Sequence, residues 1–270
     1  MTAEIRPIRL AITSIKTPLR HVSQISSIGW LPMLGLMLGI FIAILVSAHY
    51  ELTASLLLAV VVSFTYAMIA VPWIRKIALD EPAGSPMNYL PNNPNVQAAG
   101  LLVFVLNLLQ LLLNQLGLSA GLELLTIQAD STLVISSSAA SYYLIIYVLV
   151  MVIGIRLAPL MVMASTGAPL NLAEAWWLGR NQTLALAMTA IATSLGSAAV
   201  ISPMFLILSA LSPVLQGNST LLASGIMAGV SLMLALYLLA VSACLLAHVD
   251  EALRGSSTTG NGEDDEDEVV

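Results

Sequence analysis

The chain has 270 residues, of which 58% are hydrophobic and only 9% are charged. Ordinary soluble domains carry about 25% charged residues, so this composition excludes an ordinary soluble domain and predicts a chain that is solvated by lipid. The formal net charge of −6 comes from six consecutive acidic residues, 263–268, and the rest of the chain is neutral. Basic residues do not cluster in the way that nucleic-acid binding requires. The single cysteine, Cys244, excludes an intrachain disulfide.

The first 28 residues predict an amphipathic helix at the membrane surface. In "IRPIRLAITSIKTPLRHVSQI", residues 5–25, apolar side chains recur at helical spacing and basic side chains occupy an adjoining face. This pattern is typical of a helix in the headgroup layer, where each basic residue gains about 1 kcal/mol from anionic lipid. We expect a break at Pro18, and binding of a protein partner is the alternative role. The basic residues are Arg6, Arg9, Lys16 and Arg20.

Six segments reach the roughly 20 apolar residues that a helix needs to cross the hydrocarbon core. We therefore expect an all-α, polytopic membrane protein with six transmembrane helices. The N-terminal segment, 1–28, is followed by a six-helix transmembrane domain, 29–250, and by an acidic tail, 251–270. We expect the tail to be disordered, and docking to a basic partner is its alternative role. The predicted spans are 29–48, 52–72, 97–117, 140–163, 184–211 and 221–247.

The distribution of lysine and arginine predicts the orientation of these spans. The nine basic residues lie in the N-terminal segment, in the connections after the second and fourth spans, after the last span or, for Arg156, within the cytoplasmic end of the fourth span. The other three connections, around Tyr50, Ala129 and Gly217, contain none. Because basic loops stay on the cytoplasmic side, we expect both termini to be cytoplasmic.

The third span carries a stripe of amides. Asn107, Gln110 and Asn114 are spaced i, i+3 and i+7, so they share one face of a helix. Amides in lipid need partners, and hydrogen bonding to neighbouring helices is the expected role. A polar path for a transported solute is the alternative. Because no Asp, Glu, Lys or His stands near the middle of any span, the sequence argues against an ion-coupled transporter.

The connection after the fourth span, "RLAPLMVMASTGAPLNLAEAWWLGR", concentrates charge and tryptophan at the cytoplasmic boundary. We expect Arg156 to snorkel to the interface and to pair with Glu174, which forms a capping box with Asn171 at the start of a helix. Trp176 suits the headgroup layer, and we expect it to make a cation–π contact with Arg180, one turn away. A lipid-headgroup or substrate site at Arg156 is the alternative.

A similar element follows the second span. In "WIRKIALDEPAGSPMNYL", Arg75 follows an isoleucine and precedes a turn with the pattern Gly-x-Pro-hydrophobic-Asn. Arg156 also follows an isoleucine and precedes a turn with the same pattern. Duplication of a helical hairpin would explain the match, and chance in so biased a composition is the alternative.

These two elements resemble those of a group of bacterial six-helix inner-membrane proteins. "VPWIRKIALDEP" and "RLAPLMVMASTGAPLNLAEAWWLGR" are similar to the elements that close the second and fourth helices in this group, although Ile74 stands where the group often has histidine. The group is akin to the YciC-like family and to the membrane domain of some glycerophosphodiester phosphodiesterases. The resemblance covers roughly residues 25–250, and it implies a six-helix fold in the bacterial inner (plasma) membrane without chemistry of its own.

The chain lacks the patterns of a catalytic or cofactor site. His21 and His248 fall on the predicted cytoplasmic side and His49 on the other, so the histidines cannot gather a metal ion. No H-E-x-x-H pattern or glycine-rich phosphate loop occurs. We therefore expect no cofactor and no catalysis.

The leading hypothesis is an organising or accessory subunit that contacts membrane lipids or another membrane protein. The alternative is a carrier or flippase for an uncharged or amphiphilic solute.

Overall fold

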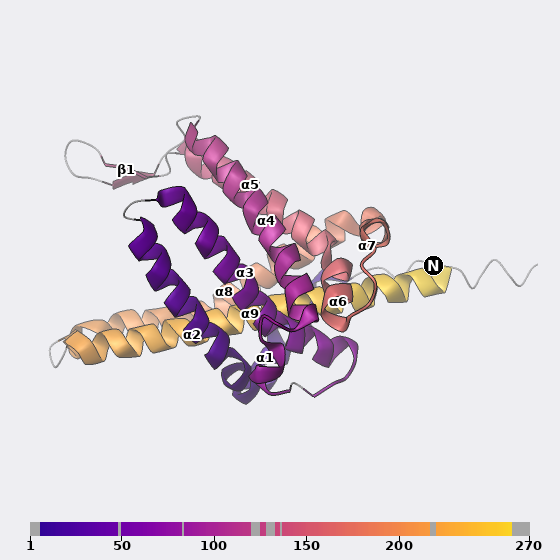
Figure 1. Cartoon of the computed structure of the whole chain (residues 1–270), viewed down its shortest axis with the longest axis horizontal. Coiled ribbons are helices and arrows are strands. Elements are labelled where there is room, and N and C mark those ends of the chain that lie inside the picture. The colour runs from indigo at the N-terminus through magenta and orange to yellow at the C-terminus, as the bar shows by residue number, and fades with distance from the viewer. Residues whose placement is uncertain are drawn as a thin grey trace, which may run out of the picture.

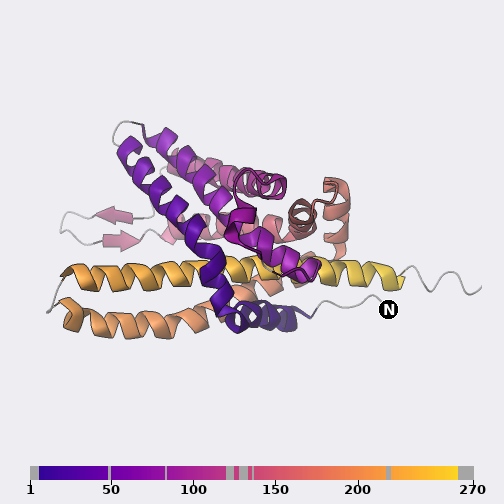
Figure 2. The ribbon, with the colours of Figure 1, turned by 60° about the horizontal axis from the view of Figure 1, so that its bottom comes forward.

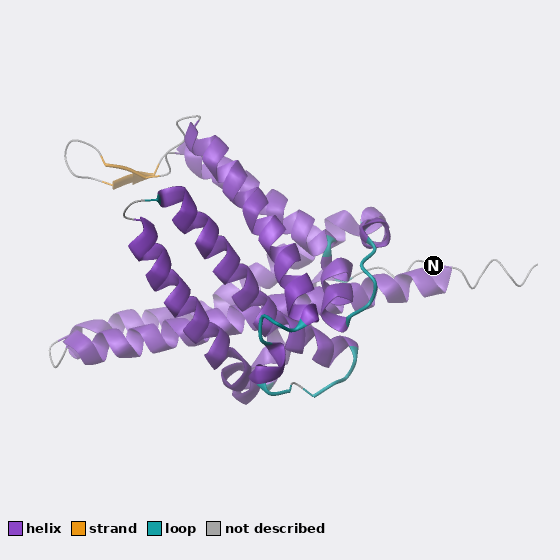
Figure 3. Cartoon of the chain, in the orientation of Figure 1, coloured by secondary structure: helices purple, strands orange, loops and turns teal. Residues whose placement is uncertain are grey.

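A computed structural model of the chain describes residues 6–47, 50–82, 84–119, 125–127, 133–135, 137–216 and 220–260. The described residues form nine α-helices, two short 3-10 helices and one small hairpin (Figures 1 and 3). The α-helices are α1 (Pro7–Arg20), α2 (Val22–Ser47), α3 (Glu51–Ala78), α4 (Pro94–Ser119), α5 (Ser137–Arg156), α6 (Ala158–Thr166), α7 (Leu172–Leu178), α8 (Thr183–Gln216) and α9 (Thr220–Gly260). The 3-10 helices are η1 (Pro86–Tyr89) and η2 (Arg180–Gln182).

The helical fold class and the multi-pass membrane character are confirmed. Among the described residues, α2, α3, α4, α8 and α9 are each long and apolar enough to cross a membrane. The pair α5 and α6 adds a sixth crossing if the two helices count as one span. The sequence did not predict the small hairpin, in which β1 (Leu125–Ile127) pairs antiparallel with β2 (Leu133–Ile135).

The prediction of one continuous fourth span over 140–163 is wrong. α5 ends at Arg156, α6 begins at Ala158, and the two axes differ by 50°. Pro159 explains the break, because proline has no amide hydrogen to donate and its ring clashes with the carbonyl of Ile155. Arg156 therefore lies at a corner of the chain rather than inside a straight helix.

The N-terminal helix packs on the bundle through its small residues. Ala11, Ser14 and Pro18 are buried where α1 crosses α8 and α9. Ile8 and Ile12 stay exposed beside the basic face. The predicted break at Pro18 is wrong, because α1 continues through Pro18 and ends at Arg20. After His21 the chain turns into α2, so the first long helix begins seven residues before the predicted span at 29.

The long helices form three antiparallel hairpins, α2 with α3, α4 with α5, and α8 with α9 (Figures 1 and 2). Figure 2 shows α8 and α9 running side by side at a steep angle to α2 and α3. The main core lies where α3 meets α2, α6 and α9, and its largest fully buried side chain is Trp73. Close approach within the hairpins relies on glycine, since a Cβ atom at Gly39 would collide with Val61.

The last helix is longer than the predicted span. α9 continues to Gly260, so residues 251–260, which were expected to be disordered, are helical. An i,i+4 ion pair between Asp250 and Arg254 (2.9 Å) and the buried side chain of Leu253 support this extension. The acidic run 263–268 lies outside the described residues.

Candidate functional site

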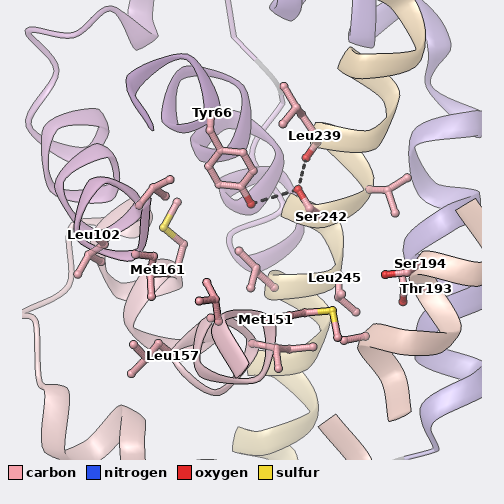
Figure 4. Close-up of a pocket in the computed structure, with 18 of the residues that line it drawn as sticks. Tyr66, Leu102, Met151, Leu157, Met161, Thr193, Ser194, Leu239, Ser242 and Leu245 are labelled. Carbon is pink, nitrogen blue, oxygen red and sulfur yellow. Dashed lines mark hydrogen bonds between the residues drawn. The ribbon is translucent and has the colours of Figure 1, made fainter. Parts of the chain in front are cut away.

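A cavity of about 1180 Å³ lies among α3, α4, α5, α6, α8 and α9 (Figure 4). Its wall is mostly apolar, with leucine, valine and methionine side chains pointing inward. Examples are Leu102 of α4, Met151 of α5, Met161 of α6 and Leu245 of α9. Sites for small molecules usually enclose about 300–1,000 Å³, so this cavity has room for a larger apolar molecule.

Several polar groups in the wall are bonded to the protein itself. The Ser242 hydroxyl donates to the Leu239 carbonyl oxygen (2.8 Å), and its oxygen lies 3.2 Å from the Tyr66 hydroxyl (Figure 4). The Thr193 hydroxyl donates to the carbonyl oxygen of Thr189 (2.8 Å). Because these groups already have partners, they do not need a polar ligand, and none is arranged as a nucleophile beside a base.

The predicted amide stripe divides into two parts. Asn107 Nδ2 donates to the hydroxyl oxygen of Ser63 (2.9 Å), which is fully buried on α3, so hydrogen bonding between helices is confirmed at this position. Of the three amides, only Asn107 lines the cavity. Gln110 and Asn114 are partly exposed and make no side-chain hydrogen bond with the described residues. The stripe therefore does not extend the cavity into a polar path.

Arg75 is a structural link between helices. Its Nε and Nη2 atoms donate to the two carboxylate oxygens of Glu81 (2.9 Å each), and its Nη1 atom donates to the carbonyl oxygen of Ser165 at the end of α6 (3.3 Å). A bidentate arginine–carboxylate pair is geometrically specific, so this contact fixes the chain after α3 against α6.

The contacts predicted around Glu174 are wrong. Glu174 pairs with Arg254 of α9 (3.8 Å) instead of Arg156, because α9 extends far enough to bring Arg254 beside α7. Arg180 lies over Trp177 (4.5 Å to the ring centroid) instead of Trp176. The one-turn spacing assumed for Trp176 and Arg180 does not exist, since α7 ends at Leu178 and a 3-10 helix follows. The predicted cap is confirmed, because the Asn171 side chain accepts from the Glu174 amide (3.1 Å).

Arg156 lies between two residues that line the cavity. Its guanidinium lies 3.9 Å from the centroid of the Trp176 ring, a cation–π distance. Both of its chain neighbours, Ile155 and Leu157, line the cavity, and Trp176 lies one helical turn after Leu172, which also lines it. The sequence alone suggested Arg156 as an unusual residue, but it gave no sign of the cavity beside it.

Within the described ranges, no group of three or more His, Cys, Asp or Glu side chains could hold a metal ion. No protein-family model, curated protein or solved structure matches this chain. The similarity of the two Arg-containing elements to the YciC-like group stays a prediction.

Proposed function

We propose that this chain is a non-catalytic integral membrane protein that binds a membrane lipid in the cavity. In this proposal it acts as an organising or accessory subunit, in contact with lipid or with a membrane partner, in a bacterial inner membrane with both termini cytoplasmic. The observation that carries the proposal is the large apolar cavity among α3, α4, α5, α6, α8 and α9.

The volume and the lining of the cavity support a bound lipid. The cavity is partly open at the protein surface and its wall is mostly apolar, so apolar molecules gain by covering it. Water is a poor occupant, since each buried water needs two to four polar partners and most of the wall is apolar. Acyl chains are the apolar molecules that a bilayer supplies in excess.

The exposed surface of α1 also supports contact with lipid. Ile8 is 70% exposed and Ile12 is 45% exposed, and the exposed basic residues Arg9, Lys16 and Arg20 lie beside them. An exposed apolar stripe beside basic residues fits the headgroup layer of an anionic leaflet.

A carrier for an amphiphilic solute is the second candidate, and the polar residues in the cavity wall favour it. Asn107 lines the cavity, as do hydroxyl residues on α8, among them Thr193 and Ser197. A carrier would speed the movement of a fluorescent lipid between the leaflets of reconstituted vesicles, and an accessory subunit would not. Co-purification of a stoichiometric membrane partner would favour the accessory role.

Filling the cavity tests the proposal. In Gly154→Phe, the new side chain enters the cavity, since a Cβ atom at Gly154 meets only Leu106 Cδ1, at 3.8 Å. We expect this variant to fold and to lose the phospholipid that co-purifies with the wild-type protein in mild detergent. Native mass spectrometry and phosphorus analysis would measure the bound lipid.

Gly35→Phe is the matched control, because Gly35 also lies inside a long helix and a Cβ atom there meets no atom within 4 Å. This variant should keep the wild-type amount of lipid. If Gly154→Phe keeps as much lipid as Gly35→Phe, the lipid does not occupy the cavity and the proposal fails.

A further inference from the structure

We infer that the bound lipid is anionic and that Arg156 binds its phosphate group beside the cavity. This inference rests on the proposed function, which places the acyl chains in the cavity, and it adds the chemical class of the headgroup.

Two arginines in matching sequence positions differ in their surroundings. Arg75 follows an isoleucine at the end of α3, and its charge is neutralised by the bidentate contact with Glu81. Arg156 follows an isoleucine at the end of α5, and no described carboxylate lies within ion-pair distance of it. A cation at a membrane boundary without an acidic partner is a candidate site for an external anion.

One hydrogen-bonding group of Arg156 also lacks an acceptor. Its Nε atom is buried and has no hydrogen-bond partner within the described part of the chain. A buried donor without an acceptor is unfavourable, and a phosphate oxygen would satisfy it. The ring of Trp176 covers one face of the guanidinium, which leaves the planar edge for the paired N–H bonds that arginine makes to phosphate.

The position of Arg156 matches that of a lipid headgroup above its acyl chains. The cavity-lining residues of α5 run from Tyr147 to Ile155. At 1.5 Å per residue, they extend roughly 13 Å along the helix from Arg156. A lipid with its phosphate at Arg156 would therefore place the first part of its chains against this wall.

The charge of Arg156 itself favours an anionic headgroup over a zwitterionic one. Glu174, on the same helix as Trp176, pairs with Arg254 (3.8 Å) and not with Arg156. A zwitterionic lipid with its phosphate at Arg156 would bring its ammonium group close to the guanidinium, which repels it. The surroundings of Arg156 therefore favour a headgroup with net negative charge.

The test compares lipids that differ only in their headgroup. Purified full-length protein in mild detergent is stripped of lipid and mixed with phosphatidylglycerol and phosphatidylcholine that carry identical acyl chains. Native mass spectrometry then counts each bound lipid. Both lipids carry the phosphate group, so the difference between them comes from the choline ammonium, which the nearby guanidinium of Arg156 repels. We expect the wild-type protein to prefer phosphatidylglycerol by roughly tenfold.

Arg156→Gln should bind both lipids about equally, and Arg156→Lys, which keeps the charge but not the planar edge, should keep only part of the preference. Arg20→Gln, at an exposed basic position of α1, controls for general attraction to the basic side and should keep the full preference. If Arg156→Gln keeps the wild-type preference, the inference is wrong. If Arg156→Gln does not fold, Arg156→Lys provides the test. A preference for phosphatidylglycerol as large as that of the wild-type protein would then contradict the inference.

Three further outcomes separate the sources of error. If sn-glycerol 3-phosphate displaces phosphatidylglycerol at equal concentration, the ligand is a soluble phosphate ester and the lipid assignment fails. If the wild-type protein retains neither lipid, the proposed function itself fails. If it retains both lipids equally, only the anionic headgroup is excluded.

Discussion

Trp73→Ala is expected to destabilise the protein by about 3–5 kcal/mol, the cost of removing a large aromatic side chain from a core. Trp73 is fully buried on α3, where α2, α6 and α9 meet. The amine of Lys76 lies 5.5 Å from its ring centroid, and the imidazole of His21 lies 6.5 Å away in a tilted arrangement. The truncation would therefore leave a cavity and also remove the contacts that join the end of α3 to the junction of α1 and α2. Equilibrium unfolding in detergent would measure the loss.

Two controls separate this effect from a general sensitivity to losing tryptophan. Trp30 on α2 is 48% exposed, so Trp30→Ala should cost much less than Trp73→Ala. Trp73→Phe should also cost less, because the Trp73 indole nitrogen has no hydrogen-bond partner among the described residues and a phenyl ring keeps most of the packing. Equal losses for Trp73→Ala and Trp30→Ala would show that the core does not lie at α3.

Reporter fusions are expected to give an all-or-none result for the orientation. A reporter that is active only outside the cytoplasm should give no signal after Val270 and a strong signal in the connection 217–219. The reason is that all nine lysines and arginines fall on one predicted side.

The reverse pattern of signals would overturn the orientation. A signal at both positions would mean an even number of crossings between them and would show that α9 does not cross the membrane once. The bent pair α5 and α6 could not explain that result, because only α9 separates the two fusion sites. Moving the second fusion to the connection after α3, around Pro82, provides a cytoplasmic control that should stay silent.

The sequence predicted those parts of the fold that depend on local patterns. Long apolar runs predicted the positions of the long helices, because a bilayer imposes both length and composition on a span. The spacing of Asn171 and Glu174 predicted the start of α7, because a cap depends on residues three apart. The bend at Pro159 was present in the sequence but was overlooked, since the apolar run continues through it.

The contacts of the site could not be predicted in the same way. Glu174 and Arg254 are 80 residues apart, and their contact depends on the length and direction of α9. The cavity depends on how the axes of several helices diverge and on small residues such as Gly154 and Ala198, which leave space without a recognisable pattern. The sequence could therefore identify Arg156 as an unusual charge and could not show the cavity beside it.

Photo-crosslinking is the most direct test of the central claim, that the cavity holds the acyl chains of a membrane lipid. The protein is reconstituted into vesicles with a phospholipid that carries a diazirine on one acyl chain, irradiated, digested and mapped by mass spectrometry. The account predicts adducts on Met151 and Leu245 in the cavity wall, and these adducts should disappear in Gly154→Phe. Leu195, which is 67% exposed on α8, should be labelled equally in both proteins. Labelling of Leu195 without labelling of Met151 or Leu245 in the wild-type protein would contradict the account.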